Sequence, residues 1–192
     1  MILILSSPSG AGKTTLAKKI ANNDNNFKIS VSYTTRSPRI NETEGIDYNF
    51  VNIDKFRELS SQKKFLEQAK VFGNYYGTLK GPIETDLANG KDYLFDIDWQ
   101  GAEQVKKVMP KDIVPVFILP PSINDLESRL KKREEKNIDI INLRMKMAKH
   151  EITHWKDYKY IVVNKDVEHC LEQINGIIKI ERNLRSTLNN IN

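Results

Sequence analysis

The stretch Ser6-Ser7-Pro8-Ser9-Gly10-Ala11-Gly12-Lys13-Thr14-Thr15 follows a short apolar run, 1–5, and precedes a segment with helical periodicity. Strand, glycine-containing turn, Gly-Lys-Thr and helix is the order that binds a polyphosphate. Gly10 and Gly12 allow backbone N–H groups to approach phosphate oxygens. Lys13 is expected to reach the β- and γ-phosphates, and the Thr14 hydroxyl to bind Mg²⁺.

The whole loop is therefore the predicted ATP-binding segment. Its members are Ser7, Pro8, Ser9, Gly10, Ala11, Gly12, Lys13, Thr14 and Thr15. The consensus for such loops is Gly-x-x-x-x-Gly-Lys-Ser/Thr, and Ser7 stands where the first glycine falls. Serine is small enough for the position, but the sequence leaves the backbone angles at Ser7 open.

Composition indicates one compact globular domain. The chain has 192 residues, 39% of them hydrophobic and 29% charged, which suits a single core and not a disordered or membrane protein. Its longest apolar run, 113–119, is too short to span a bilayer. One cysteine, Cys170, allows no intrachain disulfide, and a phosphate loop within the first ten residues leaves no place for a signal peptide. A cytoplasmic protein is expected.

The net charge of +5 fits either nucleic acid or a site for several phosphates. No motif that combines aromatic and basic residues supports nucleic-acid binding, so that alternative is not favoured.

Apolar strand patterns alternate with helical patterns along the chain, which predicts a parallel α/β sheet with helices on both faces. Residues 92–98 form a buried-strand pattern that ends in Asp96 and Asp98. The first of these acids is expected to hold Mg²⁺ through water. Predicted helices cover 13–22, 54–61, 81–89, 99–108, 123–133, 141–155 and 167–184, with a frayed tail from Leu188.

Residues 33–80 are more polar and contain short strand patterns, which predicts a small, mostly β insertion. Its first part, 33–39, carries Arg36 and Arg39 three residues apart. An arginine pair suits a doubly charged phosphate, although the spacing alone favours a solvated loop. The stretch 73–78, with two tyrosines between glycines, is expected to be a turn.

Five motifs in order make the sequence resemble the guanylate kinases, nucleoside-monophosphate kinases of the phosphate-loop class. After the phosphate loop they are Ser32-x-Thr34-Thr35-Arg36-x-Pro38-Arg39, Asp47-Tyr48, Gly73-Asn74-Tyr75-Tyr76-Gly77-Thr78 and Asp96-Ile97-Asp98-x-Gln100-Gly101. The resemblance covers the chain from Leu3 to about Leu184. It implies reversible phosphoryl transfer from ATP to GMP with Mg²⁺, in purine nucleotide metabolism and GMP recycling.

The resemblance also implies roles for individual residues. Those expected to hold the GMP phosphate are Arg36, Arg39, Tyr48 and Tyr76, and those expected at the guanine end are Ser32, Glu67, Thr78 and Asp98. Guanine presents N1–H and a 2-amino group, two adjacent donors that a carboxylate accepts together and that adenine does not match. Without the family pattern, an exposed strand carboxylate is the favoured interpretation of Glu67.

The resemblance places Arg129, Arg133 and Arg144 in a lid over the phosphates, at 123–150. With Lys13 and Arg36 they form the expected catalytic set, because phosphoryl transfer requires charge compensation and exclusion of water. Asn164 is expected near adenine, with Pro121. The core then comprises 1–32, 81–122 and 151–192.

Three other interpretations remain open on sequence grounds. One is a catalytically silent guanylate-kinase-like interaction module, and another is a kinase for a different monophosphate. The third is a zinc hydrolase, because His150-Glu151-Ile152-Thr153-His154 matches His-Glu-x-x-His; no third ligand follows at a suitable spacing, so a packing helix with Met145, Ala148, Ile152 and Trp155 is preferred. The oligomeric state, monomer or homodimer, is not fixed.

Overall fold

The computed structural model describes residues 1–133 and 137–191, without the side chains at 133, 189 and 191. The elements follow in this order: β1 (Ile2–Ser6), α1 (Lys13–Asn23), β2 (Phe27–Ile29), β3 (Tyr33–Thr34), β4 (Asn49–Phe50), α2 (Ile53–Ser61), β5 (Phe65–Val71), β6 (Asn74–Leu79), α3 (Lys80–Ala88), β7 (Asp92–Asp96), α4 (Trp99–Val108), β8 (Ile113–Leu119), α5 (Ile123–Arg133), α6 (Ile138–Thr153), η1 (His154–Asp157), β9 (Tyr160–Val163) and α7 (Val167–Ile191).

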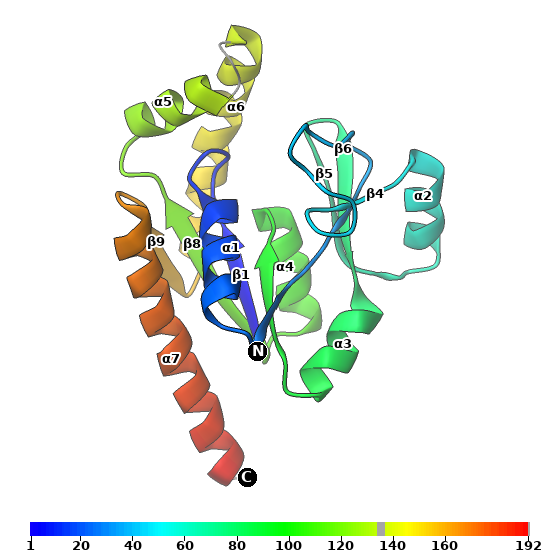
Figure 1. Ribbon diagram of the computed structural model, residues 1–192, viewed down its shortest axis with the longest axis vertical. Coiled ribbons are helices and arrows are strands. Elements are labelled where there is room, and N and C mark those ends of the chain that lie inside the picture. Colours follow the sequence, from blue (N-terminus) through cyan, green and yellow to red (C-terminus); the bar gives the residue numbers. More distant parts are fainter. Residues whose placement is uncertain (134–136, 192) are drawn as a thin grey trace.

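The central sheet has the strand order β2-β7-β1-β8-β9, and every neighbouring pair is parallel. Helices α1 and α7 cover one face, while α3 and α4 cover the other (Figure 1). The predicted parallel sheet with helices on both faces is therefore confirmed. In the part of the chain that the structure describes, no helix has the length and apolar character needed to cross a membrane.

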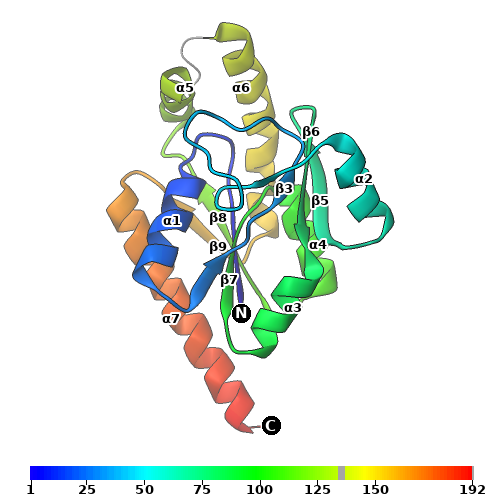
Figure 2. The ribbon, with the colours of Figure 1, turned by 45° about the vertical axis from the view of Figure 1, so that its right-hand side comes forward.

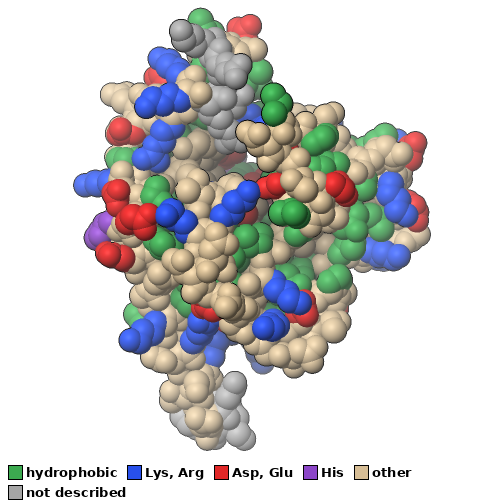
Figure 3. All heavy atoms as spheres, viewed as in Figure 1, with side chains coloured by type: hydrophobic (Ala, Val, Ile, Leu, Met, Phe, Trp, Pro, Cys, Tyr) green, Lys and Arg blue, Asp and Glu red, His purple; other side chains and the backbone are tan. Residues whose placement is uncertain are grey.

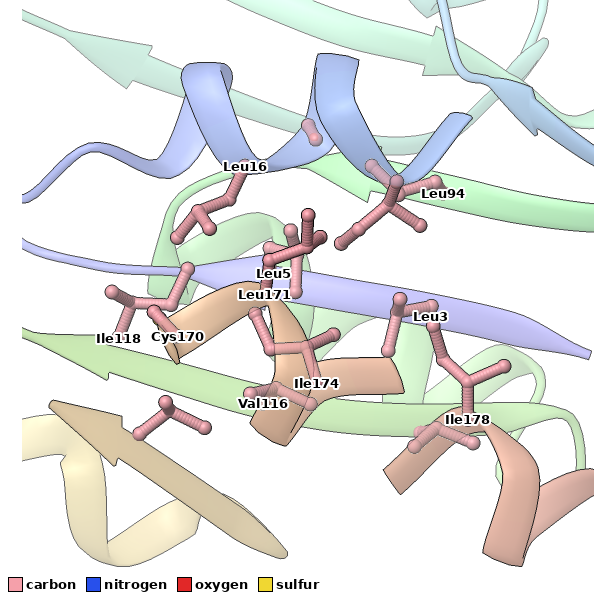
Figure 4. Packing of buried hydrophobic residues seen from close by; sticks show 14 of the residues in the cluster. Leu3, Leu5, Leu16, Leu94, Val116, Ile118, Cys170, Leu171, Ile174 and Ile178 are labelled. Atoms are coloured by element: carbon pink, nitrogen blue, oxygen red, sulfur yellow. The ribbon is translucent and has the colours of Figure 1, made fainter. Parts of the chain in front are cut away.

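Strand β1 is buried along its whole length because it lies in the middle of this three-layer arrangement. Leu3 and Leu5 face the cluster formed with α1 and α7, and Ile2 and Ile4 face the cluster formed with α4. Figure 4 shows Leu16 of α1 and Ile174 of α7 directed toward the same layer around Leu5. The phosphate loop thus starts from the most enclosed strand of the molecule.

A second, smaller sheet of order β4-β3-β6-β5 lies beside the central one and carries α2 on its far side (Figure 1). The predicted turn at 73–78 is wrong, because 74–79 form strand β6. The actual turn is Phe72-Gly73, where φ is 48° and 82°. Two consecutive positive φ values make a two-residue hairpin turn, so both tyrosines lie in the strand.

Several predicted boundaries also move. Helix α2 begins at Ile53, one residue before the predicted 54, because Asn52 caps it by accepting from the Lys55 N–H at 2.8 Å. The strands of the predicted insertion are short: β3 comprises Tyr33–Thr34 and β4 comprises Asn49–Phe50.

The last two helices differ from expectation as well. Helix α6 begins at Ile138, earlier than the predicted 141, because Asn137 caps it by accepting from the Ile140 N–H. Trp155 lies in the short η1 helix and is 38% exposed, so it is not a core residue. Helix α7 continues to Ile191, because no proline or glycine interrupts it after Gly176.

The position of Leu5 predicts a large effect of truncation. Leu5→Ala should lower the free energy of unfolding by about 2–5 kcal/mol, because the cavity is enclosed by two helices and the sheet. Urea denaturation measures this. Ile161→Ala, at a β9 position that is 43% exposed, is the control and should change stability by less than about 1 kcal/mol. Equal effects of the two changes would contradict the assigned layer order.

Candidate functional site

The phosphate loop has the backbone that its glycines predict. Gly10 and Gly12 have φ of 93° and 96°, in the region that glycine adopts readily. A Cβ at Gly12 would lie 2.5 Å from the Asn164 amide nitrogen. Among the described residues only Lys63 and Phe72 combine a side chain with positive φ. Ser7 therefore has ordinary backbone angles, and serine replaces the consensus glycine without strain.

One backbone carbonyl of the loop accepts hydrogen bonds from side chains of other segments. The Ala11 carbonyl accepts from Asn164 Nδ2 at 2.8 Å and from Arg129 at 3.4 Å, and Arg129 also donates to the Asn164 carbonyl at 2.9 Å. Two N–H groups of the loop are engaged within the protein as well, since Ser9 donates to the Glu151 carboxylate and Ala11 to the Pro8 carbonyl, both at 3.1 Å. Asn164 Oδ1 is buried with no hydrogen-bond partner in the described structure, so it is an available acceptor beside the loop.

Lys13 pairs with Asp96, the last residue of β7, and also donates to the Ile97 carbonyl at 3.2 Å. Burial lowers the pKa of the Lys13 ammonium, but Asp96, Tyr48 and Asp98 together raise it by more, so its pKa lies above the ordinary value. The loop lysine is therefore fully charged, and the carboxylate expected near Mg²⁺ lies beside it.

Helix α6 contacts both the loop and the small sheet. Arg144 donates to Ser9 Oγ at 2.8 Å, and its guanidinium lies 4.8 Å from the Phe72 ring centre at the tip of the β5–β6 hairpin. The Glu151 carboxylate accepts from the Ser9 backbone N–H at 3.1 Å. Burial raises the pKa of the Glu151 carboxyl, while that N–H opposes the rise. The predicted lid arginines 129 and 144 thus both reach the loop, whereas the Arg133 side chain lies outside the described residues.

Positive charge is also exposed on the surface of helices α5 and α6. Figure 3 shows Lys and Arg side chains on the upper lobe, which α5 and α6 form. Lys131 is exposed and pairs with Glu127 on its own helix. It belongs to a solvated face, while Arg129 donates to the backbone carbonyls of Ala11 and Asn164 at the loop.

The two arginines of the insertion share an acidic partner. Arg36 makes two hydrogen bonds to Glu42, both at 2.8 Å, and the Arg39 N–H donates to the same carboxylate at 2.9 Å. The Arg39 guanidinium lies 3.6 Å from it. These contacts lower the pKa of Glu42 despite the opposing effect of burial. One anion therefore already gathers both arginines, as a phosphate would.

Tyr48 and Tyr76 lie beside this pair, with ring centres 5.9 Å apart. The Arg36 guanidinium lies 5.3 Å from the Tyr48 ring centre. Burial raises the pKa of the Tyr48 hydroxyl, and the Asp96 carboxylate raises it further. The tyrosines thus lie between the arginines and the charged groups at the end of β7.

Glu67 is the most unusual side chain of the site, because it is only 3% exposed. Thr78 Oγ1 donates to its carboxylate at 2.6 Å, and Ser32 Oγ lies 2.9 Å from Thr78 Oγ1. A hydroxyl has one proton, so with Glu67 ionised the direction is fixed: Ser32 donates to Thr78, and Thr78 to Glu67. The alternative of an exposed strand carboxylate is wrong.

Burial raises the pKa of Glu67 to about 7, although its bond from Thr78 acts in the opposite direction. Asp98 adds to the rise. Asp98 itself caps α4 by accepting from the Gly101 N–H at 2.9 Å. The carboxylates expected at the guanine end therefore meet at the N-terminus of α4, against β5 (Figure 2).

The His-Glu-x-x-His segment packs against the start of α4 in the structure. His154 stacks on Trp99 with ring centres 3.7 Å apart, and His150 lies 5.1 Å from His154. The described residues contain no group of three or more acidic, histidine or cysteine side chains that could hold a metal ion. A zinc centre is thus not supported. Of the preferred packing residues, Ala148 is buried and Met145 packs beside it.

Two residues of the site were missed by the sequence analysis. Glu42 had a detectable signal, because it follows Arg36 and Arg39 at the same spacing of three residues. A loop of this composition carries many charges, however, so the spacing did not single it out. Glu151 was considered only as part of the zinc motif. Its contact with Ser9 spans 142 residues of sequence, and no local pattern predicts such a contact.

Fold and site together define a class, the phosphate-loop kinases that act on nucleoside monophosphates: a parallel sheet, an anion-binding loop with its lysine, and an arginine-rich second site opposite. Comparisons give the family. The guanylate kinase family model matches residues 1–181, and the chain belongs to the guanylate kinase family, whose members transfer a phosphoryl group from ATP to GMP.

Individual relatives agree with the family model. The chain is 50% identical to a guanylate kinase of Rickettsia felis over 95% of this chain and 94% of that one. It is 48% identical to that of Maricaulis maris, over 95% and 84%. A crystal structure of guanylate kinase from Anaplasma phagocytophilum superimposes with a TM-score of 0.81 at 39% identity, covering 94% and 85%. Nothing among these relatives favours a silent interaction module.

The raised pKa of Glu67 predicts how stability changes with pH. A carboxyl whose folded pKa is about 7, above the ordinary 4.5, stabilises the fold as the neutral acid; this contribution is complete below pH 4.5 and is lost as the pH rises through 7. Glu67→Gln should therefore be more stable than the parent by roughly 2–3 kcal/mol at pH 8, and much less so at pH 5.

Urea denaturation at the two pH values tests this, with exposed Glu172→Gln as the control for the substitution itself. An advantage of Glu67→Gln that is equal at both pH values would contradict a buried, proton-binding Glu67.

Proposed function

We propose that this chain transfers the γ-phosphoryl group of ATP to the phosphate of GMP between the phosphate loop and the small sheet. The observation that carries the proposal is the pairing of two sites across the end of β7. Asp96 contacts the loop lysine, and two residues later Asp98 caps α4 next to the buried Glu67. ATP bound at the loop and GMP bound beside Glu67 would thus meet over the end of one strand.

In the ATP site, residues 7–15 hold the phosphates through backbone N–H groups and Lys13. Asn164 supports the loop at Ala11, and its unpaired Oδ1 suits the amino group of adenine. Arg129 and Arg144, already at the loop, compensate charge on the transferring group, and Arg133 joins them by family resemblance.

The residues near Lys13 fit a magnesium ion bound with ATP. Mg²⁺ takes few protein ligands and prefers oxygen, and it keeps waters and phosphate oxygens around it. Thr14 offers a hydroxyl on the exposed first turn of α1, and Asp96 a carboxylate at the end of β7. When bound, the ion neutralises charge on the phosphates. Lys13 keeps Asp96 directed toward the loop.

In the GMP site, Arg36 and Arg39 hold the phosphate beside Tyr48 and Tyr76. The GMP dianion displaces Glu42 from at least part of its contacts, since both would use the same guanidinium donors. At the other end the ionised Glu67 accepts from guanine N1–H and the 2-amino group. Ser32, Thr78 and Asp98 help to fix the orientation of the guanine base.

The chain divides by role into three parts. Residues 33–80 bind GMP, 123–150 act as a lid, and the rest forms the core. The lid excludes water, because hydrolysis of ATP competes with transfer. No general base is required, since a phosphate oxygen is already the nucleophile. The buried free thiol of Cys170 suits a reducing cytoplasm.

Lys13→Ala tests the ATP site. It should lower kcat by about 100-fold or more, because a charge aimed at the transferring phosphate is lost, while the fold persists. A coupled ADP-release assay with ATP, Mg²⁺ and GMP measures turnover, and circular dichroism checks folding. Lys19→Ala, a surface lysine of the same helix that pairs with Glu168, is the control. Normal turnover of Lys13→Ala would remove the loop from the mechanism.

Glu67→Gln tests the GMP site. The amide offers one acceptor and one clashing donor to guanine, so kcat/KM for GMP should fall by on the order of 100-fold or more, with little change toward AMP. In the parent, kcat/KM for GMP should also fall as the pH drops through about 7, since the protonated Glu67 no longer accepts both donors.

The second pKa of the GMP phosphate, about 6, contributes to that profile, and the Glu67→Gln profile isolates this contribution. An unchanged GMP-to-AMP ratio in the variant would exclude Glu67 as the guanine-reading residue.

A further inference from the structure

One position beside Glu67 has no side chain, and the structure shows why. Gly101 is buried in the first turn of α4. A Cβ built on it would lie 2.6 Å from Glu67 Oε2 and 3.2 Å from the Glu67 carboxyl carbon. Real Cβ atoms do not approach an oxygen so closely, so an added methyl group would force Glu67 to move.

Backbone conformation does not explain the glycine. Gly101 is absent from the described residues with positive φ, so alanine could adopt its backbone angles, and alanine is the better helix former. The requirement for glycine at this point is therefore steric, and the atoms concerned belong to Glu67.

The strand that carries Glu67 cannot easily retreat. Gln104, one turn beyond Gly101, forms two hydrogen bonds with the backbone of Gln68: it accepts from the N–H at 3.0 Å and donates to the carbonyl at 2.7 Å. This amide fastens β5 to α4 at the residue next to Glu67. Any displacement caused by a side chain at 101 would thus fall on the Glu67 side chain.

The other carboxylate oxygen is fixed as well. Thr78 donates to Glu67 Oε1 at 2.6 Å, so rotation of the carboxylate away from α4 would break this bond and the chain to Ser32. The carboxylate thus has one orientation that satisfies Thr78, and the space at Gly101 permits that orientation.

We propose that Gly101 is a specificity-determining residue, because the absence of a Cβ there lets Glu67 hold the orientation that accepts both guanine donors. This inference rests on the proposed guanine-reading role of Glu67. Gly101 acts through Glu67 and is a positioning residue. Its effect should therefore appear in the recognition of the base and not in the handling of ATP.

The central variant is Gly101→Ala, assayed with GMP and with IMP, whose base lacks the 2-amino group. The variant should lower kcat/KM for GMP by on the order of 100-fold, mainly through KM, since a displacement of about 1 Å disturbs the paired hydrogen bonds. The GMP-to-IMP ratio should fall, while KM for ATP stays within about twofold of the parent value.

A matched control is Gly176→Ala, a helical glycine of α7 with no atom within 4 Å of the added methyl group. It should leave both substrates unaffected and raise Tm slightly through helix propensity. A loss of GMP activity in Gly176→Ala would show that glycine replacement in a helix is harmful in general, which would overturn the inference.

A double-mutant cycle with Glu67→Ala separates the steric effect from a general structural one. In the Glu67→Ala background there is no carboxylate to displace, so adding Gly101→Ala should change kcat/KM for GMP by less than about twofold and should raise Tm. An additional loss of activity or a lower Tm in that background would overturn the inference. The same comparison decides the case if Gly101→Ala alone does not fold.

Glu67→Gln distinguishes this inference from the proposed function. If Glu67→Gln keeps its preference for GMP, the role of Glu67 fails and the inference fails with it. If Glu67→Gln loses that preference but Gly101→Ala keeps it, the role of Glu67 stands and only the inference about Gly101 is overturned.

Discussion

The structure depends on one constraint, the backbone conformation of the short loop between β1 and α1, which only glycine adopts readily at two positions. Gly10 and Gly12 supply the backbone angles. The Ala11 carbonyl accepts hydrogen bonds from Asn164, which follows β9, and from Arg129 of α5. Three segments far apart in sequence are thus joined at a single peptide group. The strand from which the loop starts, β1, lies in the centre of the parallel sheet.

Charge on the site is balanced internally. Lys13 has Asp96, Arg36 and Arg39 have Glu42, and Arg144 contacts Ser9 next to Glu151. Each cation that would bind a phosphate is thus held in place by a protein group, which reduces the reorganisation that substrate binding requires. The arrangement also has a cost, because phosphate must compete with Glu42 for the same donors. Kinase chemistry, which needs positioned charge more than covalent steps, suits such a site.

In the proposed GMP site, base recognition rests on a buried carboxylate, which is an unfavourable group to enclose. Glu67 is tolerated because Thr78 and Ser32 form a directed chain of hydrogen bonds to it, and because Gly101 leaves room at the start of α4. Burial nevertheless raises the pKa of Glu67 to about 7, because the hydrogen bond from Thr78 offsets the effect of burial only in part. A group with this pKa is ionised often enough to accept from guanine near neutral pH.

The sequence by itself determined the phosphate loop, the alternation of strands and helices, and the family, because these depend on local spacing and on short motifs. It failed at the Phe72-Gly73 turn and at the end of α7, where neighbouring strands and continued helical hydrogen bonding decide the outcome. Only the tertiary structure decided that Glu67 is buried, that Glu42 joins two arginines, and that Glu151 contacts Ser9. Burial and long-range pairing depend on which elements meet in space, and residue spacing along the chain does not encode that directly.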